Sequence, residues 1–233
     1  MIKAVFFDFY DTIVDLDPPR QELQAQACRE FGIEINPLTI SQGYFHANNF
    51  LSIENARHSI QKRTPEQLQN FWAEYESIIL KHSGADVSKN LALRIFTRMR
   101  ELDRRFVLFD DVLPVIKQLY KRDITIGLIS NLNRTLEMYC DALGLTPYIR
   151  FTAVSYEVGE EKPHPKIFMT ALERAGTEAS ETIHVGDQYE SDVVGARRVG
   201  INPVLLDREG FWGYINDCTC IRSLAEVIDL LDA

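Results

Sequence analysis

The sequence predicts an α/β protein, in which a doubly wound parallel sheet carries an inserted helical domain. Apolar runs of strand length show no polar alternation, which is typical of strands covered on both faces. Helical patterns separate most of these runs, as in parallel sheets built from right-handed crossovers. Residues 16 to about 105 differ, because they contain no convincing strand and read instead as several amphipathic helices.

The predicted strands are short runs rich in branched and aromatic residues. In chain order they are "AVFF" (4–7), "ITIGLIS" (124–130), "IRFTAV" (149–154), "TIHVG" (182–186) and "INPVLL" (201–206). Helices are expected after the later strands, over residues 133–145, 164–176 and 190–200. Each of these helices is expected to stop at a glycine, which readily adopts the left-handed conformation found there: Gly144, Gly176 and Gly200.

The region after the first strand has helix start and stop signals of its own. In "DPPRQELQAQACREFG" (17–32) the two prolines can start a helix and Gly32 can end it. A longer helix is predicted from "TPEQLQNFWAEYESIILKH" (64–82), with Thr64 as the N-cap and Gln67 at the capping-box position.

An apolar stripe on that longer helix predicts the core of a helix bundle rather than a ligand site, since any packed helix shows such periodicity. Its members are Phe71, Tyr75, Ile78 and Ile79. A chain of 233 residues suits one core domain with a large insertion. We therefore expect a core domain of residues 1–15 and 106–233 and a helical domain of residues 16–105.

Composition narrows the function classes. The formal charge of -9, the pI near 5.1 and the lack of a Lys/Arg run argue against nucleic acid and anionic membranes as partners. No segment has the pattern of a signal peptide or reaches membrane-spanning length, so a cytoplasmic protein is expected. The cysteines are expected to be free thiols, and the pair Cys218 and Cys220 has no second pair to complete a zinc site.

Polar residues follow the predicted strands where ligands bind in open parallel sheets, at the carboxyl ends. They are Asp8 and Tyr10, Ser130 and Asn131, Lys162, and Asp187 and Asp192. Taken singly, Asn131 could be a turn residue, Lys162 a solvated charge and Asp187 a helix cap. Together they form one set of charges on one edge of one sheet.

This set of charges fits phosphoryl chemistry. Carboxylates without a counter-charge would repel one another, so we expect Mg²⁺, which takes hard oxygen ligands such as those of Asp8 and Asp187. A serine hydroxyl with its adjacent amide, and a lysine ammonium, suit a phosphoryl group. A carboxylate held beside the phosphorus can attack it and form an aspartyl phosphate.

At this point the sequence resembles the haloacid dehalogenase superfamily over nearly its full length. The four motifs of that family match "DFYDT", the serine of "LISN", the lysine of "EEKPHPKIF" and "GDQYESD", in that order. The resemblance implies that Asp8 is the nucleophile. It also implies that Ser130 binds phosphate, that Lys162 is the charge clamp, that Asp187 is a metal ligand and that Asp192 helps to hold the metal or its waters. Residues 16–105 then resemble the family's helical cap, which closes over the site and selects substrate.

Tyr10 departs from the phosphatase pattern, in which the first motif reads Asp-x-Asp and the second Asp is the general acid and base. Haloacid dehalogenases of the superfamily carry Tyr at this position, and phosphonatases also lack the Asp. The acidic pair in "GDQYESD" points instead to a magnesium enzyme, whose metal the backbone carbonyl of Tyr10 can still bind. A phenol with a pKa near 10 is a poor base at neutral pH. Asp11 is interpreted as a turn residue and His164 as a loop variation.

Three hypotheses about the function follow from these observations. The first is a Mg²⁺-dependent phosphatase for a small phosphorylated metabolite, slow because Tyr10 replaces the acid/base, with Asp8, Tyr10 and Lys162 in catalytic roles. Its alternative is a 2-haloacid dehalogenase, in which Asp8 attacks carbon and no metal is needed. A third reading, from another class, is a binding or regulatory protein on the same scaffold with little turnover. The sequence indicates neither the anionic substrate nor the oligomeric state.

Overall fold

A computed structural model describes residues 1–231 of the chain. It divides the chain into two compact units, which are described separately. The core unit comprises Met1–Asp15 and the chain from Phe106 onward, and the helical unit comprises Leu16–Arg105.

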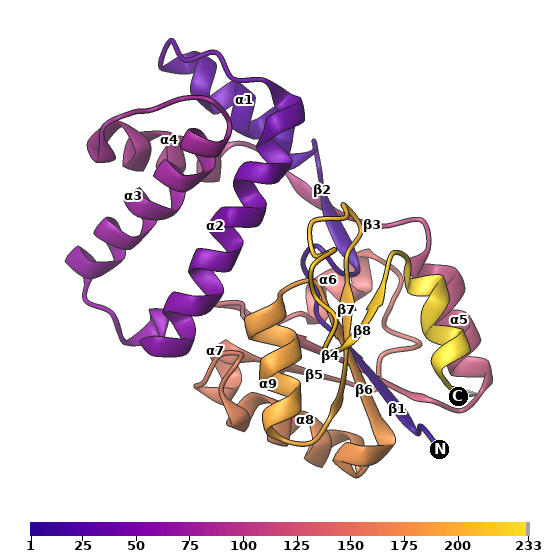
Figure 1. Cartoon of the computed structure of the whole chain (residues 1–233). Coiled ribbons are helices and arrows are strands. Elements are labelled where there is room, and N and C mark those ends of the chain that lie inside the picture. Colours follow the sequence, from indigo (N-terminus) through magenta and orange to yellow (C-terminus); the bar gives the residue numbers. More distant parts are fainter. Residues whose placement is uncertain (232–233) are drawn as a thin grey trace. The chain divides into compact units, whose positions relative to one another are not determined.

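The core unit contains a parallel sheet of six strands in the order β5-β4-β1-β6-β7-β8, among the residues described (Figure 1). The strands are β1 (Ala4–Phe7), β4 (Thr125–Ser130), β5 (Phe151–Val154), β6 (Thr182–Gly186), β7 (Asn202–Leu206) and β8 (Thr219–Ile221). The helices of this unit are α5 (Val112–Lys121), α6 (Glu137–Ala142), α7 (Ser155–Val158), α8 (Pro165–Ala175) and α9 (Gly195–Arg198), with a 3₁₀ turn at Ala179–Glu181 and a 3₁₀ segment at Leu224–Leu231. The predicted α/β class and parallel sheet are confirmed.

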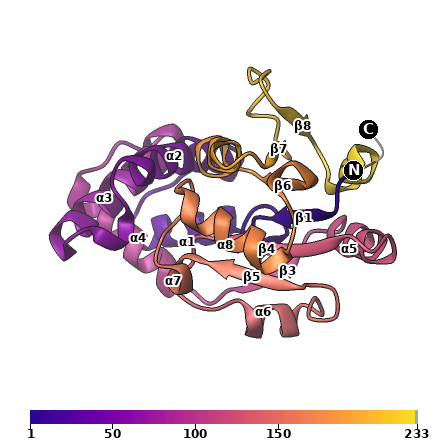
Figure 2. The same ribbon diagram turned by 90° about the horizontal axis from the view of Figure 1, so that it is seen from below.

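Helices cover both faces of this sheet, and the side chains of β1 alternate between the two layers (Figures 1 and 2). Val5 and Phe7 are buried in one cluster with residues of α5 and of the segment Leu224–Leu231. Ala4 and Phe6 are buried in the other cluster, with Ile167 and Phe168 of α8. Burial of both faces explains why these strands are continuously apolar.

Several elements differ from the prediction. The helix expected over 133–145 is limited to α6, and the helix expected over 190–200 begins as a π-helical turn, Tyr189–Val194, before α9. Neither β8 nor α5 was predicted. β8 was missed because it has only three residues and a partly polar sequence. Gly176 does end α8, in the left-handed conformation with φ 68°.

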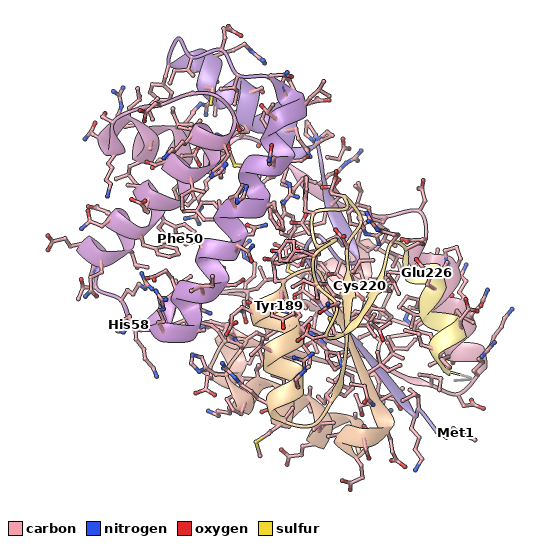
Figure 3. All side chains as sticks on the ribbon, viewed as in Figure 1. Met1, Phe50, His58, Tyr189, Cys220 and Glu226 are labelled. Carbon is pink, nitrogen blue, oxygen red and sulfur yellow. The ribbon has the colours of Figure 1, made fainter. Side chains whose placement is uncertain are left out.

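The helical unit is built from four helices among the residues described. They are α1 (Arg20–Glu30), α2 (Pro37–Arg57), α3 (Pro65–His82) and α4 (Lys89–Glu101), with a 3₁₀ turn at Ile60–Lys62. The predicted capping box is confirmed, because Thr64 Oγ1 accepts the Gln67 N–H and the Gln67 side chain accepts the Thr64 N–H. The predicted stripe on α3 packs in the core of this unit, where Phe71 stacks with ring centroids 5.3 Å apart on Phe50, which Figure 3 labels.

The prediction that residues 16–105 contain no strand is wrong at its two ends. There β2 (Val14–Asp17) and β3 (Arg105–Leu108) pair in a two-stranded sheet. Each strand has only four residues. β2 alternates buried and half-buried positions, whereas β3 has one exposed residue followed by three half-buried ones, so neither leaves a pattern long enough to recognise.

A buried polar cluster lies between α1, α2 and α3 of the helical unit. Glu76 is 1% exposed and accepts a hydrogen bond of 2.5 Å from Gln24 Nε2. The Tyr44 hydroxyl donates to Gln24 Oε1 over 2.8 Å. Burial raises the pKa of Glu76 to about 8, against the opposing effect of the Gln24 hydrogen bond.

The pKa of Glu76 predicts that the helical unit loses stability as pH rises. The unfolded chain releases this proton near pH 4.5, whereas the folded unit keeps it until about pH 8, so stability declines across that window. Glu76→Gln, which mimics the protonated carboxyl, should therefore stabilise the unit at pH 8 by on the order of 3 kcal/mol and change little at pH 4.5. Urea unfolding followed by the fluorescence of Trp72, the tryptophan of this unit, measures the effect. Exposed Glu66→Gln is the control, and an equal gain at both pH values would contradict the prediction.

Among residues 1–231, no helix combines the length and the apolar character that crossing a bilayer requires.

Candidate functional site

The predicted site residues gather at the carboxyl ends of adjacent strands of the core unit. Asp8 follows β1, Ser130 ends β4, and Asp187 follows β6. The order β4-β1-β6 places these strand ends side by side. All of these residues come from one unit, so their arrangement does not depend on the helical unit.

Lys162 lies between two of the predicted carboxylates. Its ammonium is 2.5 Å from Asp8 Oδ1 and 2.6 Å from Asp192 Oδ1, and its side chain is 2% exposed. The expectation that the carboxylates meet without a basic residue among them is therefore wrong for Asp8 and Asp192. Although burial opposes the charged form of Lys162, these two carboxylates raise its pKa.

Asp192 is buried, and both of its carboxylate oxygens have hydrogen-bond partners. Its Oδ1 also lies 2.9 Å from His184 Nε2, and its Oδ2 accepts the Gln188 N–H over 3.0 Å. Burial opposes its ionisation, yet Lys162 and His184 hold the pKa of Asp192 below its usual value. The side chain packs directly under Gly186, where a Cβ would clash with it. These contacts favour a role in orienting Lys162, while direct metal binding by Asp192 stays a prediction.

Asn131 holds the loop that carries Lys162. Its side-chain amide donates to the Lys162 carbonyl over 3.0 Å, and its side-chain oxygen accepts the Lys162 N–H over 2.7 Å. These two hydrogen bonds hold the backbone of Lys162 in place. Substrate binding by Asn131 and by the buried Ser130 stays a prediction.

Asp187 is the carboxylate with excess negative charge around it. Burial raises its pKa most, and the charges of Asp11, Asp8 and Asp192 raise it further. Asp11 adopts the predicted turn, with φ 63°. Of the three neighbouring carboxylates, Asp11 raises the pKa of Asp187 most. The sequence predicts the turn at Asp11 but not this effect of its charge on Asp187.

Tyr10 lies in the turn after β1, where it forms a bridge with Val14. Its ring contacts Phe106 with centroids 6.1 Å apart, and it packs against the hydrophobic cluster on that face of the sheet. The aromatic ring thus contributes to packing beside the loop that carries Asp8.

The donor set fits a magnesium ion. Burial raises the pKa of Asp8 to about 7 and Lys162 opposes this rise, so a further cation would favour the ionised form. No group of three or more His, Cys, Asp or Glu side chains within residues 1–231 is arranged to hold an ion by itself. Magnesium usually needs only one or two carboxylates, completed by carbonyl, water and phosphate oxygens. Asp8 and Asp187 with the carbonyl of Tyr10 would hold it.

Two residues that the sequence analysis did not single out donate hydrogen bonds to backbone carbonyls in the loops of the site. Arg208 forms a two-pronged ion pair with Asp111, both N–O distances being 2.9 Å, and donates to the Thr12 carbonyl over 2.9 Å. Trp212 donates its indole N–H to the Asp187 carbonyl over 3.0 Å. No local sequence signal joins residues this far apart.

Known proteins resemble the chain in both sequence and structure. The family model "haloacid dehalogenase-like hydrolase" matches residues 2–200. A glyceraldehyde 3-phosphate phosphatase of Methanopyrus kandleri is 28% identical over 213 residues, which cover 89% of this chain and 85% of that protein.

Two solved structures share the fold. The magnesium-bound YfnB of Bacillus subtilis is 21% identical with a TM-score of 0.66, covering 100% of this chain and 99% of the other. A 2-haloacid dehalogenase of Pseudomonas syringae is 26% identical with a TM-score of 0.58 and the same two coverages, 100% and 99%.

Proposed function

The chain belongs to the haloacid dehalogenase-like hydrolases, and we propose that it is a magnesium-dependent phosphatase acting on a small phosphorylated metabolite. The observation that carries the proposal is the half-buried carboxylate of Asp187, which follows β6 beside the end of β1 that carries Asp8, and whose pKa is raised by burial and by the charges of Asp11 and Asp8. Lys162 already forms ion pairs with Asp8 and Asp192, so a divalent cation would balance the negative charge at Asp187. The related glyceraldehyde 3-phosphate phosphatase supports a phosphate ester as substrate.

In this proposal Asp8 performs the chemical step. An oxygen of its carboxylate forms a bond to phosphorus while the bond from phosphorus to the leaving-group oxygen breaks. The leaving group takes a proton from solvent water and departs as an alcohol. Water then attacks the aspartyl phosphate, releases inorganic phosphate and restores Asp8.

The surrounding side chains position and balance charge for that step. Lys162, held by Asp192 and by the amide of Asn131, keeps the attacking carboxylate in place and offsets charge on the phosphoryl oxygens. Ser130, at the end of β4, would donate a hydrogen bond to the phosphoryl group. When bound, magnesium would reduce the repulsion between Asp8 and the incoming phosphate.

A 2-haloacid dehalogenase is the second candidate, and Tyr10 is the observation that favours it. The resemblance to the dehalogenase of Pseudomonas syringae supports it as well. In that reaction Asp8 would attack carbon, halide would leave without a proton, and water would hydrolyse the ester. Activity toward phosphorylated three- to five-carbon metabolites and toward 2-haloacids, each with magnesium and with chelator, separates the two candidates. Chelator-insensitive release of halide, without release of phosphate, would overturn the phosphatase.

Magnesium binding gives a direct prediction for Asp187. Titration calorimetry should detect binding to the wild-type protein, and Asp187→Asn should weaken it by at least about tenfold, because the substitution removes a charged ligand. A rise of melting temperature with magnesium should follow in the wild type alone. Asp123→Asn, at an exposed aspartate of the same unit, is the matched control. Equal responses of wild type and Asp187→Asn would count against the metal and for the dehalogenase.

A further inference from the structure

The loop between β7 and β8 folds back onto the residue proposed to bind magnesium. Asp207, at the end of β7, is 5% exposed and organises the start of this loop. Its two carboxylate oxygens accept the N–H groups of Phe211 and Trp212 over 2.8 and 3.1 Å. The turn from Asp207 to Trp212 is therefore closed by hydrogen bonds that set the direction of the Trp212 side chain.

From this turn Trp212 reaches the neighbouring strand end. Its indole N–H, the only donor of that side chain, bonds to the backbone carbonyl of Asp187 over 3.0 Å. The side chain is buried, with Trp212 6% exposed. A buried hydrogen bond of this kind limits how far the Asp187 peptide can rotate.

The same loop also holds the segment just after Asp187. The Tyr189 hydroxyl donates to Asp217 Oδ2 over 2.7 Å, and Arg197 Nη1 donates to the same oxygen over 2.9 Å. The rings of Tyr189 and Trp212 lie with centroids 6.0 Å apart. Figure 3 labels Tyr189, which begins the π-helical turn leading to Asp192. The loop thus contacts the chain at Asp187 and again two residues later.

We infer that Trp212 is a positioning residue for the metal site, whose indole N–H holds the Asp187 peptide so that the carboxylate keeps its direction. The inference rests on the proposed magnesium-dependent function. Its physical basis is preorganisation: a ligand that is already oriented loses less freedom when the ion binds. Groups outside the coordination sphere tune metal affinity in this way. Because Trp212 bonds the peptide rather than the carboxylate, an effect at the lower end of the usual range is expected.

Trp212→Phe keeps a large apolar ring and removes the N–H. Calorimetry on the full chain should show magnesium affinity reduced by about tenfold. Trp72→Phe, in the helical unit, is the matched control and should leave the affinity within about twofold of wild type. A purely structural role would lower the melting temperature of Trp212→Phe and leave its magnesium affinity unchanged.

Fluorescence supplies a test that does not require Trp212→Phe to fold. In Trp72→Phe the remaining tryptophan is Trp212, so magnesium should change its emission with the midpoint that calorimetry gives. Adding Asp187→Asn should remove that change. Unchanged emission at saturating magnesium, or unchanged affinity in folded Trp212→Phe, would overturn the inference and leave the proposed function standing. Absence of magnesium binding in the wild type would overturn both.

Discussion

Asp8→Asn should abolish turnover of the true substrate, by at least about three orders of magnitude, while the protein stays folded. The carboxylate of Asp8 is the group proposed to form the covalent intermediate, and a neutral amide is a far weaker nucleophile. The fold should survive because Lys162 keeps its second partner, Asp192, at 2.6 Å. Product release and the circular dichroism spectrum, recorded on the same preparation, measure the two outcomes.

Asp123→Asn is the matched control for this substitution. Asp123 is exposed and lies two residues before the start of β4, at the amino end of the sheet. It adopts φ 57°, a conformation that asparagine tolerates, so the exchange should preserve the turn. Full activity in this control and residual activity above a few per cent in folded Asp8→Asn would together remove Asp8 from the nucleophile's role. The experiment holds for either substrate class, because phosphate esters and haloacids would both be attacked by this carboxylate.

Sequence reasoning reaches the strands and the residues at their ends for a physical reason. A strand buried on both faces must be apolar along its whole length, as in β4 and β6, and this leaves a local pattern. Gly176 and the capping box at Thr64 are local as well, since each depends on residues within one or two turns. Where the signal is local, the predicted and observed elements agree to within a few residues.

The charge pairing within the site does not have a local signal. Lys162 meets Asp8 across 154 residues and Asp192 across 30, and only the packed sheet brings the three together. The sequence places them at one edge but does not tell which carboxylate the lysine neutralises. That choice is decided by the loop between α7 and α8, which carries Lys162 and whose backbone is held by Asn131. It leaves Asp187, rather than Asp192, as the carboxylate with uncompensated charge.

The contribution of the β7–β8 loop could not be foreseen for the same reason. Trp212 could pack almost anywhere on sequence evidence, and its indole N–H finds the Asp187 carbonyl 25 residues away. The neighbouring strand β8 is too short to predict, and without it the path of the loop is unknown. A hydrogen bond of this type, between loops far apart in the sequence, can be predicted only when the strand order is known.

Tyr10→Asp should raise the hydrolysis of an alkyl phosphate by about 10- to 1,000-fold, which is part of the roughly 100- to 10,000-fold that general acid and base catalysis usually contributes. Tyr10 stands where related phosphatases carry their acid and base, so the wild-type protein is expected to protonate a poor leaving group slowly. An aryl phosphate such as p-nitrophenyl phosphate needs little proton assistance and should therefore gain less. Steady-state rates on both substrates, for wild type and variant, measure the difference.

The packing of Tyr10 determines the control. Its ring contacts Phe106 beside the hydrophobic cluster, so Tyr10→Asp also removes an aromatic contact and should lower the melting temperature. Tyr10→Phe keeps the ring and removes only the hydroxyl. If the phenol takes no part in phosphate hydrolysis, this variant should match the wild type on both phosphate esters. Magnesium affinity should be the same in all three proteins, because the backbone carbonyl of residue 10 is retained.

One result would reverse the assignment of substrate. If Tyr10→Asp and Tyr10→Phe both lose activity toward every phosphate ester while they still bind magnesium, the phenol itself takes part in the reaction. A phenol that donates a hydrogen bond without accepting a proton suits a reaction whose leaving group needs none. Halide is such a leaving group, and 2-haloacids would then be the substrates to test first, with Asp8→Asn as the inactive reference.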